Sequence, residues 1–434
     1  MKLGISLGDS THAVISGETG SVTAWSASQD SNLRGLAEVL DRIDSREVDR
    51  VMVANPCYSE RFPPPIVKVG ALRIAGPSST SIPTMSGWPR SLVRRLAGCV
   101  ATVSGGHHFD GSPRCSLDTD AVARFARDCR DKGIRAVAIV GTNSQSAPSH
   151  EYQAADLIME ILGQTAHVVF GNTMQGIGLI ERENTAIIEA AMAPFVSRRV
   201  DMISAHLNRV GIDTEFHVVA GSGTLISTTD LIAHPLRGHR SDDASVLTGI
   251  AHDLAVDSMI IVDSRREVVR VFTMSDGIPH QTNLGENILG VRTVVPGLQE
   301  TIVKQDATRA VPACVQRMRL WLGDVPAVRI KSFDGGHGRT LDIPSVVDVT
   351  PRGSASATGA IAARVGGVID RAFNFGDSTY DEAVWTAKAE AVDAAVRAGA
   401  DPSRIEVARF TAVPLTYVAS RSVRLGATAI GPLL

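Results

Sequence analysis

Short apolar runs alternate with stretches of helical period along almost the whole chain, which is the pattern of an α/β protein. Two of these runs, Lys2–Leu7 and Ala13–Ser16, are joined through Gly8, Asp9 and Ser10 and predict an opening hairpin. The same pattern predicts further strands at Arg50–Ala54, Val67–Ile74, Ala136–Val140, His167–Phe170, Ile405–Thr411 and Val423–Ala427.

The longest segment of helical period begins near Glu181 and continues to Val210. Pro194 lies inside this segment, and because proline removes a backbone donor and clashes with the preceding turn, we expect the helix to end or kink there. Other helices are predicted at Thr119–Lys132, ended by Gly133, at Glu151–Leu162, and at Tyr380–Ala398, ended by Gly399.

Composition places the chain among ordinary globular proteins. Its 434 residues suffice for two or three domains, with 44% hydrophobic and 21% charged residues. A net charge of −3 gives no reason to expect nucleic acid or an anionic membrane as a partner. No apolar run reaches the length of about 20 residues that spans a bilayer. The five cysteines show no CxxC spacing and the first residues do not have the pattern of a secretory signal, so we expect reduced thiols and a cytoplasmic location.

Three blocks of sequence resemble a known family, and they occur in the order found there. They are SGGHHFDGSPRCSLD (Ser104–Asp118), GLIERENTAIIEAAMAP (Gly178–Pro194) and AVDAAVRAGADPSRIEVARFTAVPLTYV (Ala391–Val418). Together they are similar to the hydantoinase/oxoprolinase family and, more narrowly, to the short form of its ATP-dependent A subunit. The more specific signals are Arg-Glu-Asn-Thr at 182–185 and Gly-Ala-Asp-Pro at 399–402.

The resemblance implies an acetate-kinase/actin-like fold, in which two ribonuclease-H-type α/β lobes face each other across a cleft. We expect a hydantoinase A-like lobe over residues 1–178, a second ribonuclease-H-like lobe over 179–350, and a C-terminal helix with strands over 351–434 that packs back on the lobes. The resemblance also implies a reaction, the ATP-assisted opening of a cyclic amide such as a hydantoin or 5-oxoproline. Some relatives carboxylate ketones instead, and members often work with a second, larger subunit.

The chain departs from the family at the loops that hold the nucleotide. The family opens with Asp-x-Gly-Gly-Thr, which here has become Ser6–Ser10, with Ser6 in place of the metal-associated aspartate and Asp9 in place of a glycine. A second strand–turn–strand, Ser258–Gly277, keeps its scaffold and Asp263. Its turn, however, reads Ser264–Glu267 where small residues would let backbone amides reach a phosphate.

Two further loops are changed in the same way. The Ser-Gly-Pro-Ala block falls on Ser241–Ala244 with two aspartates inside it, and the Gly-rich run after Gly290–Thr293 has become a polar stretch that ends at Lys304–Asp306. A carboxylate about 4 Å from a phosphate costs roughly 1–4 kcal/mol. Arg265 and Arg266 can bind phosphate, but with a different geometry. The sequence therefore predicts that ordinary ATP use is lost.

A loop bounded by glycines carries the first candidate site, which consists of His107, His108 and Asp110. Imidazole and carboxylate groups so close together can supply ligands to a divalent metal such as Zn or Mn. Alternatively, His107 is a general base oriented by Asp110. The competing interpretation is a polar turn whose histidines bond backbone carbonyls. The histidines outside this loop and the Gly335 loop, among them His150 and His234, show no metal spacing and are predicted to be surface or core residues.

Two other segments are candidates for substrate binding. Arg182 and Asn184 begin the long helix, where a substrate carboxylate or carbonyl can bind, although the neighbouring acids are explained by the helix dipole alone. Gly335 and Gly336 lie in a glycine loop after the apolar strand Val328–Ile330 and are predicted to line the cleft, the alternative being a flexible turn.

These features lead to a first hypothesis, a hydrolase that acts on the C–N bond of a small cyclic amide or imide, or closes the ring in reverse, without ATP. His107 and Asp110 would activate water directly or through a metal. A second hypothesis is a catalytically silent subunit that holds a partner chain, either a larger hydantoinase B-like subunit or another copy of itself. A third is a small-molecule binder that has kept its cleft without the chemistry.

Overall fold

The computed structural model describes residues 1–8, 10–16, 22–28, 30, 32–57, 65–76, 81–264, 268–303, 307–331, 346–350, 354–374, 379–416 and 421–434. The first lobe is built around β1 (Lys2–Leu7). β1 pairs antiparallel with β2 (Ser10–Ser16), which pairs antiparallel with β3 (Val22–Ser28), so the predicted hairpin is confirmed. On its other side β1 is followed by two parallel strands, β4 (Arg50–Ala54) and β9 (Phe216–Val219).

The second lobe repeats this arrangement around β11 (Met259–Asp263). β11 pairs antiparallel with β12 (Val269–Ser275), which pairs antiparallel with β16 (Glu300–Val303) and β13 (Ile278–Pro279). On the other side of β11 lie the parallel strands β17 (Ala327–Ile330) and β18 (Val346–Val349). The orders β3-β2-β1-β4-β9 and β16-β12-β11-β17-β18 are therefore equivalent, and they confirm a two-lobed, acetate-kinase/actin-like α/β fold of ribonuclease-H type.

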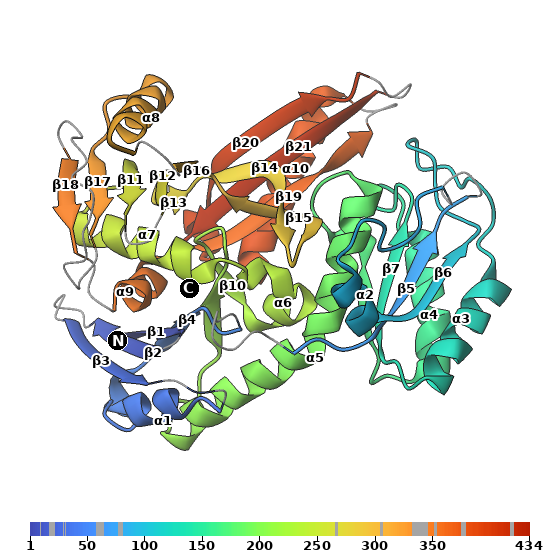
Figure 1. Cartoon of the computed structure of the whole chain (residues 1–434), viewed down its shortest axis with the longest axis horizontal. Coiled ribbons are helices and arrows are strands. Elements are labelled where there is room, and N and C mark those ends of the chain that lie inside the picture. The colour runs from blue at the N-terminus through green and yellow to red at the C-terminus, as the bar shows by residue number, and fades with distance from the viewer. Residues whose placement is uncertain are drawn as a thin grey trace.

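A separate α/β unit is inserted between β4 and β9 and forms one end of the molecule (Figure 1). Its sheet is parallel throughout, with the order β6-β5-β7-β8, as expected for strands connected by helices. The strands are β5 (Val69–Ile74), β6 (Ala97–Val103), β7 (Ala136–Gly141) and β8 (His167–Phe170), and the helices are α2 (Arg90–Leu96), α3 (Thr119–Asp131) and α4 (Ser149–Leu162).

The long helix α5 (Leu179–Arg209) passes through Pro194 as one helix of 31 residues, so it does not end there, which was one of the two predicted outcomes. It runs from the inserted unit to α1 (Arg34–Leu40) at the far side of the first lobe (Figure 1). Pro194 has no N–H to donate to the Ala190 carbonyl four residues earlier. At the next carbonyl along the helix, that of Ala191, the Val67 N–H donates from outside the helix at 3.1 Å. The residues of α5 from Arg182 to Ala193 are buried, and this burial stabilises the helix, which the sequence pattern alone does not reveal.

The predicted lobe boundaries do not coincide with the sheets. β9 and β10 (Leu225–Ser227) lie inside the predicted second lobe but belong to the sheet of the first. From the C-terminal segment, β19, β20 and β21 extend the same sheet in the order β20-β21-β19-β10 instead of only packing on the lobes. Strand pairing between distant segments depends on tertiary contacts, and local patterning does not specify it. Their bounds are β19 (Val365–Asn374), β20 (Glu406–Pro414) and β21 (Ser422–Gly431).

The remaining described elements complete the two lobes. They are the 3-10 turns η1 (Ser45–Glu47), η3 (Gly171–Thr173), η4 (Pro235–Gly238) and η5 (Pro402–Arg404), the hairpin β14 (Gln281–Ile288) and β15 (Val291–Leu298), and the helices α6 (Thr228–Ala233), α7 (Ser241–Leu254), α8 (Ala307–Leu322), α9 (Ala355–Ala362) and α10 (Tyr380–Arg397). None of the helices in the described part of the chain is long and apolar enough to cross a membrane.

The helices α7 and α9 lie between the two lobes and approach each other through glycines (Figure 1). A Cβ atom at Gly359 would lie 1.7 Å from the Ser245 carbonyl oxygen, and one at Gly249 would lie 2.1 Å from the Ala355 carbonyl oxygen. We therefore expect Gly359→Ala to lower the free energy of unfolding by about 1–3 kcal/mol through overpacking, measured by urea denaturation. Gly8→Ala is the matched control, since its Cβ would have its nearest neighbours at 3.9 Å, and equal losses in both variants would contradict the prediction.

Candidate functional site

A cavity of about 450 Å³ opens where the inserted unit, α5 and the extended sheet of the first lobe meet. Its walls are formed by α5, α6 and η4, the β9–β10 turn, β15, β19, the end of α10 and the segment after β8. This volume lies within the range of about 300–1,000 Å³ that small-molecule sites occupy in proteins. The charged or titratable side chains along its wall include Glu189, Asp230, His234, Arg237, His239 and Arg397.

Glu189 and His234 form a carboxylate–imidazole pair on this wall. His234 Nδ1 lies 3.2 Å from Glu189 Oε2, and the Leu236 backbone N–H donates to Glu189 Oε1 at 3.3 Å. Glu189 is buried at 3% side-chain exposure, whereas His234 is 12% exposed. A carboxylate that holds one ring nitrogen orients the imidazole and leaves the other nitrogen, Nε2, able to bond another group.

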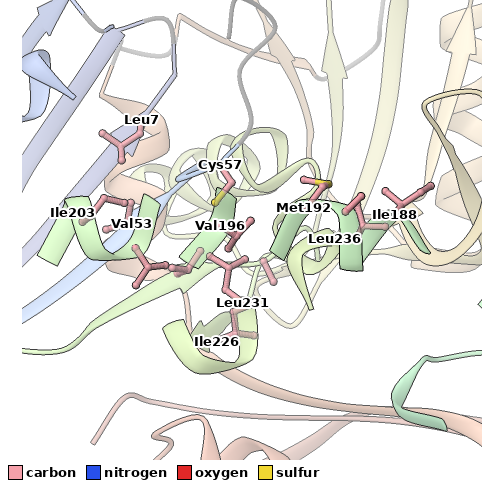
Figure 2. Close-up of a cluster of buried hydrophobic side chains, with 14 of the residues drawn as sticks. Leu7, Val53, Cys57, Ile188, Met192, Val196, Ile203, Ile226, Leu231 and Leu236 are labelled. Atoms are coloured by element: carbon pink, nitrogen blue, oxygen red, sulfur yellow. The ribbon is translucent and has the colours of Figure 1, made fainter. Parts of the chain in front are cut away.

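The segment that carries His234 is fixed from behind by the hydrophobic core. Ser227 caps α6 by accepting the Asp230 N–H, and Pro235 begins η4 directly after the helix. Leu231 and Leu236 are fully buried in this segment. Figure 2 shows them beneath α5, close to its apolar side chains Ile188, Met192 and Val196. The one polar side chain between them, His234, lines the cavity.

A second pair, Asp230 and Arg237, lies on the same wall. Arg237 Nη1 lies 2.6 Å from Asp230 Oδ1 and 2.5 Å from Oδ2. Asp230, His234 and Arg237 lie four and three residues apart, and all three line the cavity although the helical path is broken at His234, between α6 and η4. This spacing is visible in the sequence, but the sequence interpretation treated His234 as a structural residue because it lacks metal spacing.

The histidine loop lies beside the cavity, on the other side of the segment between β7 and α4. His107 is only 3% exposed, and its Nε2 lies 3.1 Å from Ser149 Oγ. Its ring stacks at 4.4 Å between centroids on His150, whose Nδ1 accepts the Gly106 N–H. Burial, and then the charge of His150, lower the pKa of His107, so the neutral imidazole is favoured. The cavity wall does not include His107.

The predicted pairing of His107 with Asp110 is not formed. Asp110 is exposed, and its Oδ1 accepts both the backbone N–H and the hydroxyl of Ser112, which lower the pKa of Asp110. His108 is exposed too, while His107 is buried, so the three predicted metal ligands do not converge. No group of three or more His, Cys, Asp or Glu residues that can hold a metal ion exists in the described part of the chain. The residues present therefore do not fit a Zn or Mn site.

The two predicted substrate ligands on α5 are used inside the protein instead. Arg182 is 2% exposed and donates to Ser144 Oγ at 3.0 Å and to the carbonyls of Gly171 and Gly141 at 3.0 and 3.2 Å. Asn184 accepts the Trp88 indole N–H at 2.9 Å and donates to the Arg292 carbonyl at 2.9 Å.

The motif around these two residues therefore ties α5 to the inserted unit and to β15. Neither side chain lines the cavity. Two further residues predicted to bind substrate, Gly335 and Gly336, lie outside the described residues.

The described residues of the predicted nucleotide loops are joined by ion pairs. Arg270 Nη2 donates to Asp263 Oδ2 at 2.9 Å, and its Nη1 donates to Asp243 Oδ2 at 2.9 Å. Arg240 donates to Asp243 at 3.1 Å and to Glu300 at 2.9 Å. Burial acts to raise the pKa of Asp243, but the two guanidinium groups outweigh it and hold that pKa below its usual range. The one aspartate kept from the second loop, Asp263, is thus bound by a protein cation.

The same network continues to the cavity. Arg240 Nη1 lies 3.1 Å from Glu286 Oε1, and Glu286 Oε2 lies 2.8 Å from Nε2 of His239, which lines the cavity. The neighbouring His239 and Arg240 pairs lower the pKa of Glu286 against the effect of its burial. The other altered positions, Asp9, residues 265–267 and residues 304–306, lie outside the described residues.

Comparison with known proteins supports the resemblance to the hydantoinase/oxoprolinase family. Residues 91–162 match the model described as the hydantoinase/oxoprolinase N-terminal region. Caprolactamase subunit alpha from Pseudomonas jessenii is 24% identical over 218 residues. That alignment covers 49% of this chain and only 30% of that subunit.

Two solved structures share the whole fold. The ATP-dependent caprolactamase from Pseudomonas jessenii matches with a TM-score of 0.73 and 16% identity, and a nucleotide-free acetone carboxylase matches with a TM-score of 0.64 and 12% identity. Each match covers 100% of this chain and 88% of the other. At these identities the similarity establishes the fold.

Proposed function

We propose that this protein is a hydantoinase-like hydrolase that opens the C–N bond of a small cyclic amide or imide, or closes the ring in reverse, without ordinary ATP use. One observation carries the proposal, namely that the Glu189–His234 pair borders a cavity of about 450 Å³. The similarity to a caprolactamase subunit supports a cyclic amide as the substrate class.

The pair supplies a direct route for water attack. With Nδ1–H of His234 donating to Glu189, Nε2 accepts a proton from a water molecule as the water oxygen bonds to the amide carbonyl carbon. The imidazolium then returns this proton to the ring nitrogen as the C–N bond breaks. The products are an amine and a carboxylic acid on one open chain, and the same groups serve ring closure in reverse. In this role Glu189 positions His234 and balances its positive charge.

The direct test is ring opening by the purified full-length protein. A panel of lactams, hydantoins and cyclic imides is incubated with and without ATP, and the ring-opened product is measured by liquid chromatography and mass spectrometry. We expect product from at least one of these classes at equal rates in both conditions. Product that forms only with ATP, or no product from any class, would contradict the proposal.

The nucleotide side of the fold supports the loss of ATP use. Arg240 and Arg270 are shared among four carboxylates, those of Asp243, Asp263, Glu286 and Glu300. A triphosphate placed there would meet this excess negative charge, at a cost of roughly 1–4 kcal/mol for each close pair. This charge arrangement supports the proposal that the protein does not use ATP in the ordinary way.

We expect millimolar ATP with Mg²⁺ to leave the thermal unfolding midpoint unchanged in a thermal-shift assay. A clear rise in that midpoint would show that the loops still bind the nucleotide.

A second candidate function is a catalytically silent subunit that holds a partner chain. The observation in its favour is the same ion-pair network, because its pairs occupy polar groups of the predicted nucleotide loops and link the segments that carry them. Affinity purification from the native cell separates the two candidates. A stoichiometric larger subunit together with no ring opening by this chain favours the scaffold, whereas ring opening by the chain alone favours the hydrolase.

A further inference from the structure

The Asp230–Arg237 ion pair on the cavity wall has no role in the water attack proposed for Glu189 and His234. We infer that Arg237 and Asp230 bind the carbonyl and N–H groups of a cis amide, with Arg237 donating to the carbonyl oxygen and Asp230 accepting from the ring N–H. The inference rests on the proposed function for the substrate class. It narrows that class to cyclic amides and imides that carry a free ring N–H.

Both side chains keep hydrogen-bonding capacity after they have paired. Arg237 uses Nη1 for both carboxylate oxygens of Asp230, and its Nη2 and Nε have no partner among the described residues. A guanidinium has five N–H donors and a carboxylate has about four lone-pair sites, so each can bind a further group. Their side chains are 35% and 27% exposed, and both line the cavity.

The backbone holds this pair in place. The Arg237 carbonyl accepts the Gly221 N–H at 2.8 Å, and the Asp230 N–H is capped by Ser227 at 3.1 Å. Leu231 and Leu236 anchor the same segment in the core (Figure 2). A donor and an acceptor are therefore fixed next to each other on one rigid wall, which is the arrangement that favours preorganised binding.

The geometry of the amide in a small ring matches this donor–acceptor pair. In a small ring the amide bond is cis, so its N–H and its carbonyl oxygen point to the same edge and meet an acceptor and a donor side by side. An open-chain secondary amide strongly prefers trans and points these groups in opposite directions. The pair thus selects rings over ordinary peptides.

Arg237 also supplies electrophilic help to the reaction. Amide carbonyls are poor electrophiles, and a guanidinium that donates to the carbonyl oxygen stabilises the negative charge that develops there when water adds. Loss of one such donor typically lowers kcat by about 10²–10³-fold. Arg237 would then stabilise the carbonyl oxygen while His234 activates the water, and both side chains come from the α6–η4 segment.

The test uses three ligands that isolate the ring N–H. They are 2-piperidone, N-methyl-2-piperidone and 3-methyl-2-piperidone, of which the last two have the same composition and differ only in whether the N–H is kept. Dissociation constants are measured by calorimetry with the full-length protein. We expect 2-piperidone and 3-methyl-2-piperidone to bind at least about 10-fold more tightly than the N-methyl compound, because the latter leaves Asp230 without its donor.

Substitutions of Arg237 and Asp230 test whether the preference for a ring N–H depends on this pair. Arg237→Met and Asp230→Asn are expected to weaken binding of 2-piperidone and to reduce its advantage over the N-methyl compound to less than about 3-fold. Arg237→Lys, which keeps the charge without the planar donors, is expected to fall between Arg237→Met and the wild type. The control is Arg130→Met, an exposed arginine on α3 outside the cavity, which should leave all constants unchanged.

The outcomes separate this inference from the proposed function. A preference for the N–H ligands that the variants remove supports the inference even if no ring opens, and the absence of ring opening then counts against the hydrolase alone. Equal binding of the two methyl isomers, or a preference that survives in Arg237→Met and Asp230→Asn, overturns the inference even if rings are opened. Absence of binding for all three ligands overturns it as well. Because the comparison of isomers uses the wild-type protein, it remains decisive if a variant fails to fold.

Discussion

The His234→Ala variant is expected to open cyclic amides about 10²–10⁴-fold more slowly than the wild type, with the loss in kcat, because it removes the proposed general base. Glu189→Gln is expected to lower kcat less, with little change in KM, since its carboxylate acts through the imidazole at 3.2 Å. Both effects are measured as initial rates of product formation.

The matched control for this prediction is His252→Ala. His252 is exposed near the end of α7 and does not line the cavity, so the same change there should leave the rate at the wild-type value. Circular dichroism and the thermal midpoint of each variant verify that the fold is intact. If His234→Ala retains wild-type activity while His107→Ala abolishes it, the catalytic base lies in the histidine loop and the proposed site is wrong.

Glu183→Gln is expected to destabilise the protein by about 3–5 kcal/mol, the largest effect on stability that we predict. Glu183 accepts from Arg73 Nε at 2.8 Å and Nη2 at 2.5 Å, and their side chains are 3% and 1% exposed. Glu183→Gln removes the carboxylate charge that faces the buried Arg73 guanidinium. Since a typical domain is stable by only about 5–15 kcal/mol, the loss should be clear in urea denaturation.

An exposed ion pair provides the control for this effect. Glu406 pairs with Arg364 at 2.9 Å but is 64% exposed, so Glu406→Gln should cost less than about 1 kcal/mol. Equal losses of unfolding free energy in Glu183→Gln and Glu406→Gln would show that burial does not determine how much the Arg73–Glu183 pair contributes to stability. Because Glu183 lies between Arg182 and Asn184, a large loss would also support a structural role for the whole Arg-Glu-Asn motif.

The predicted nucleotide loops and the cavity differ in how their charged side chains are used. On the predicted nucleotide side, Arg270 and Arg240 are paired with Asp263, Asp243 and Glu300 within the protein itself. On the cavity side, charged pairs remain at the wall with room for a ligand. The link between the two sides runs through Glu286, so a change in the network can reach His239 at the cavity.

The candidate site shows how a shared motif can be misread. The block around Arg182 and Asn184 resembles a family and predicts substrate binding, yet their polar groups bond Ser144, Trp88 and backbone carbonyls. A motif can persist because it holds a helix against its neighbours, and sequence similarity alone does not distinguish that role from ligand binding. His234 has no family block around it and was passed over, although its spacing to Asp230 and Arg237 was visible.

The sequence by itself determined the local elements of this protein. Apolar runs and turn residues predicted β1 with β2, β11 with β12, and helices such as α3 and α10, because side-chain periodicity and chain-ending glycines act over a few residues. The tertiary structure alone decided that α5 continues through Pro194, that β9, β10 and β19 join the sheet of the first lobe, and that Glu189 meets His234 across 45 residues. These outcomes depend on packing between distant segments, whose free energy exceeds the local preferences and is not written in any single stretch of the chain.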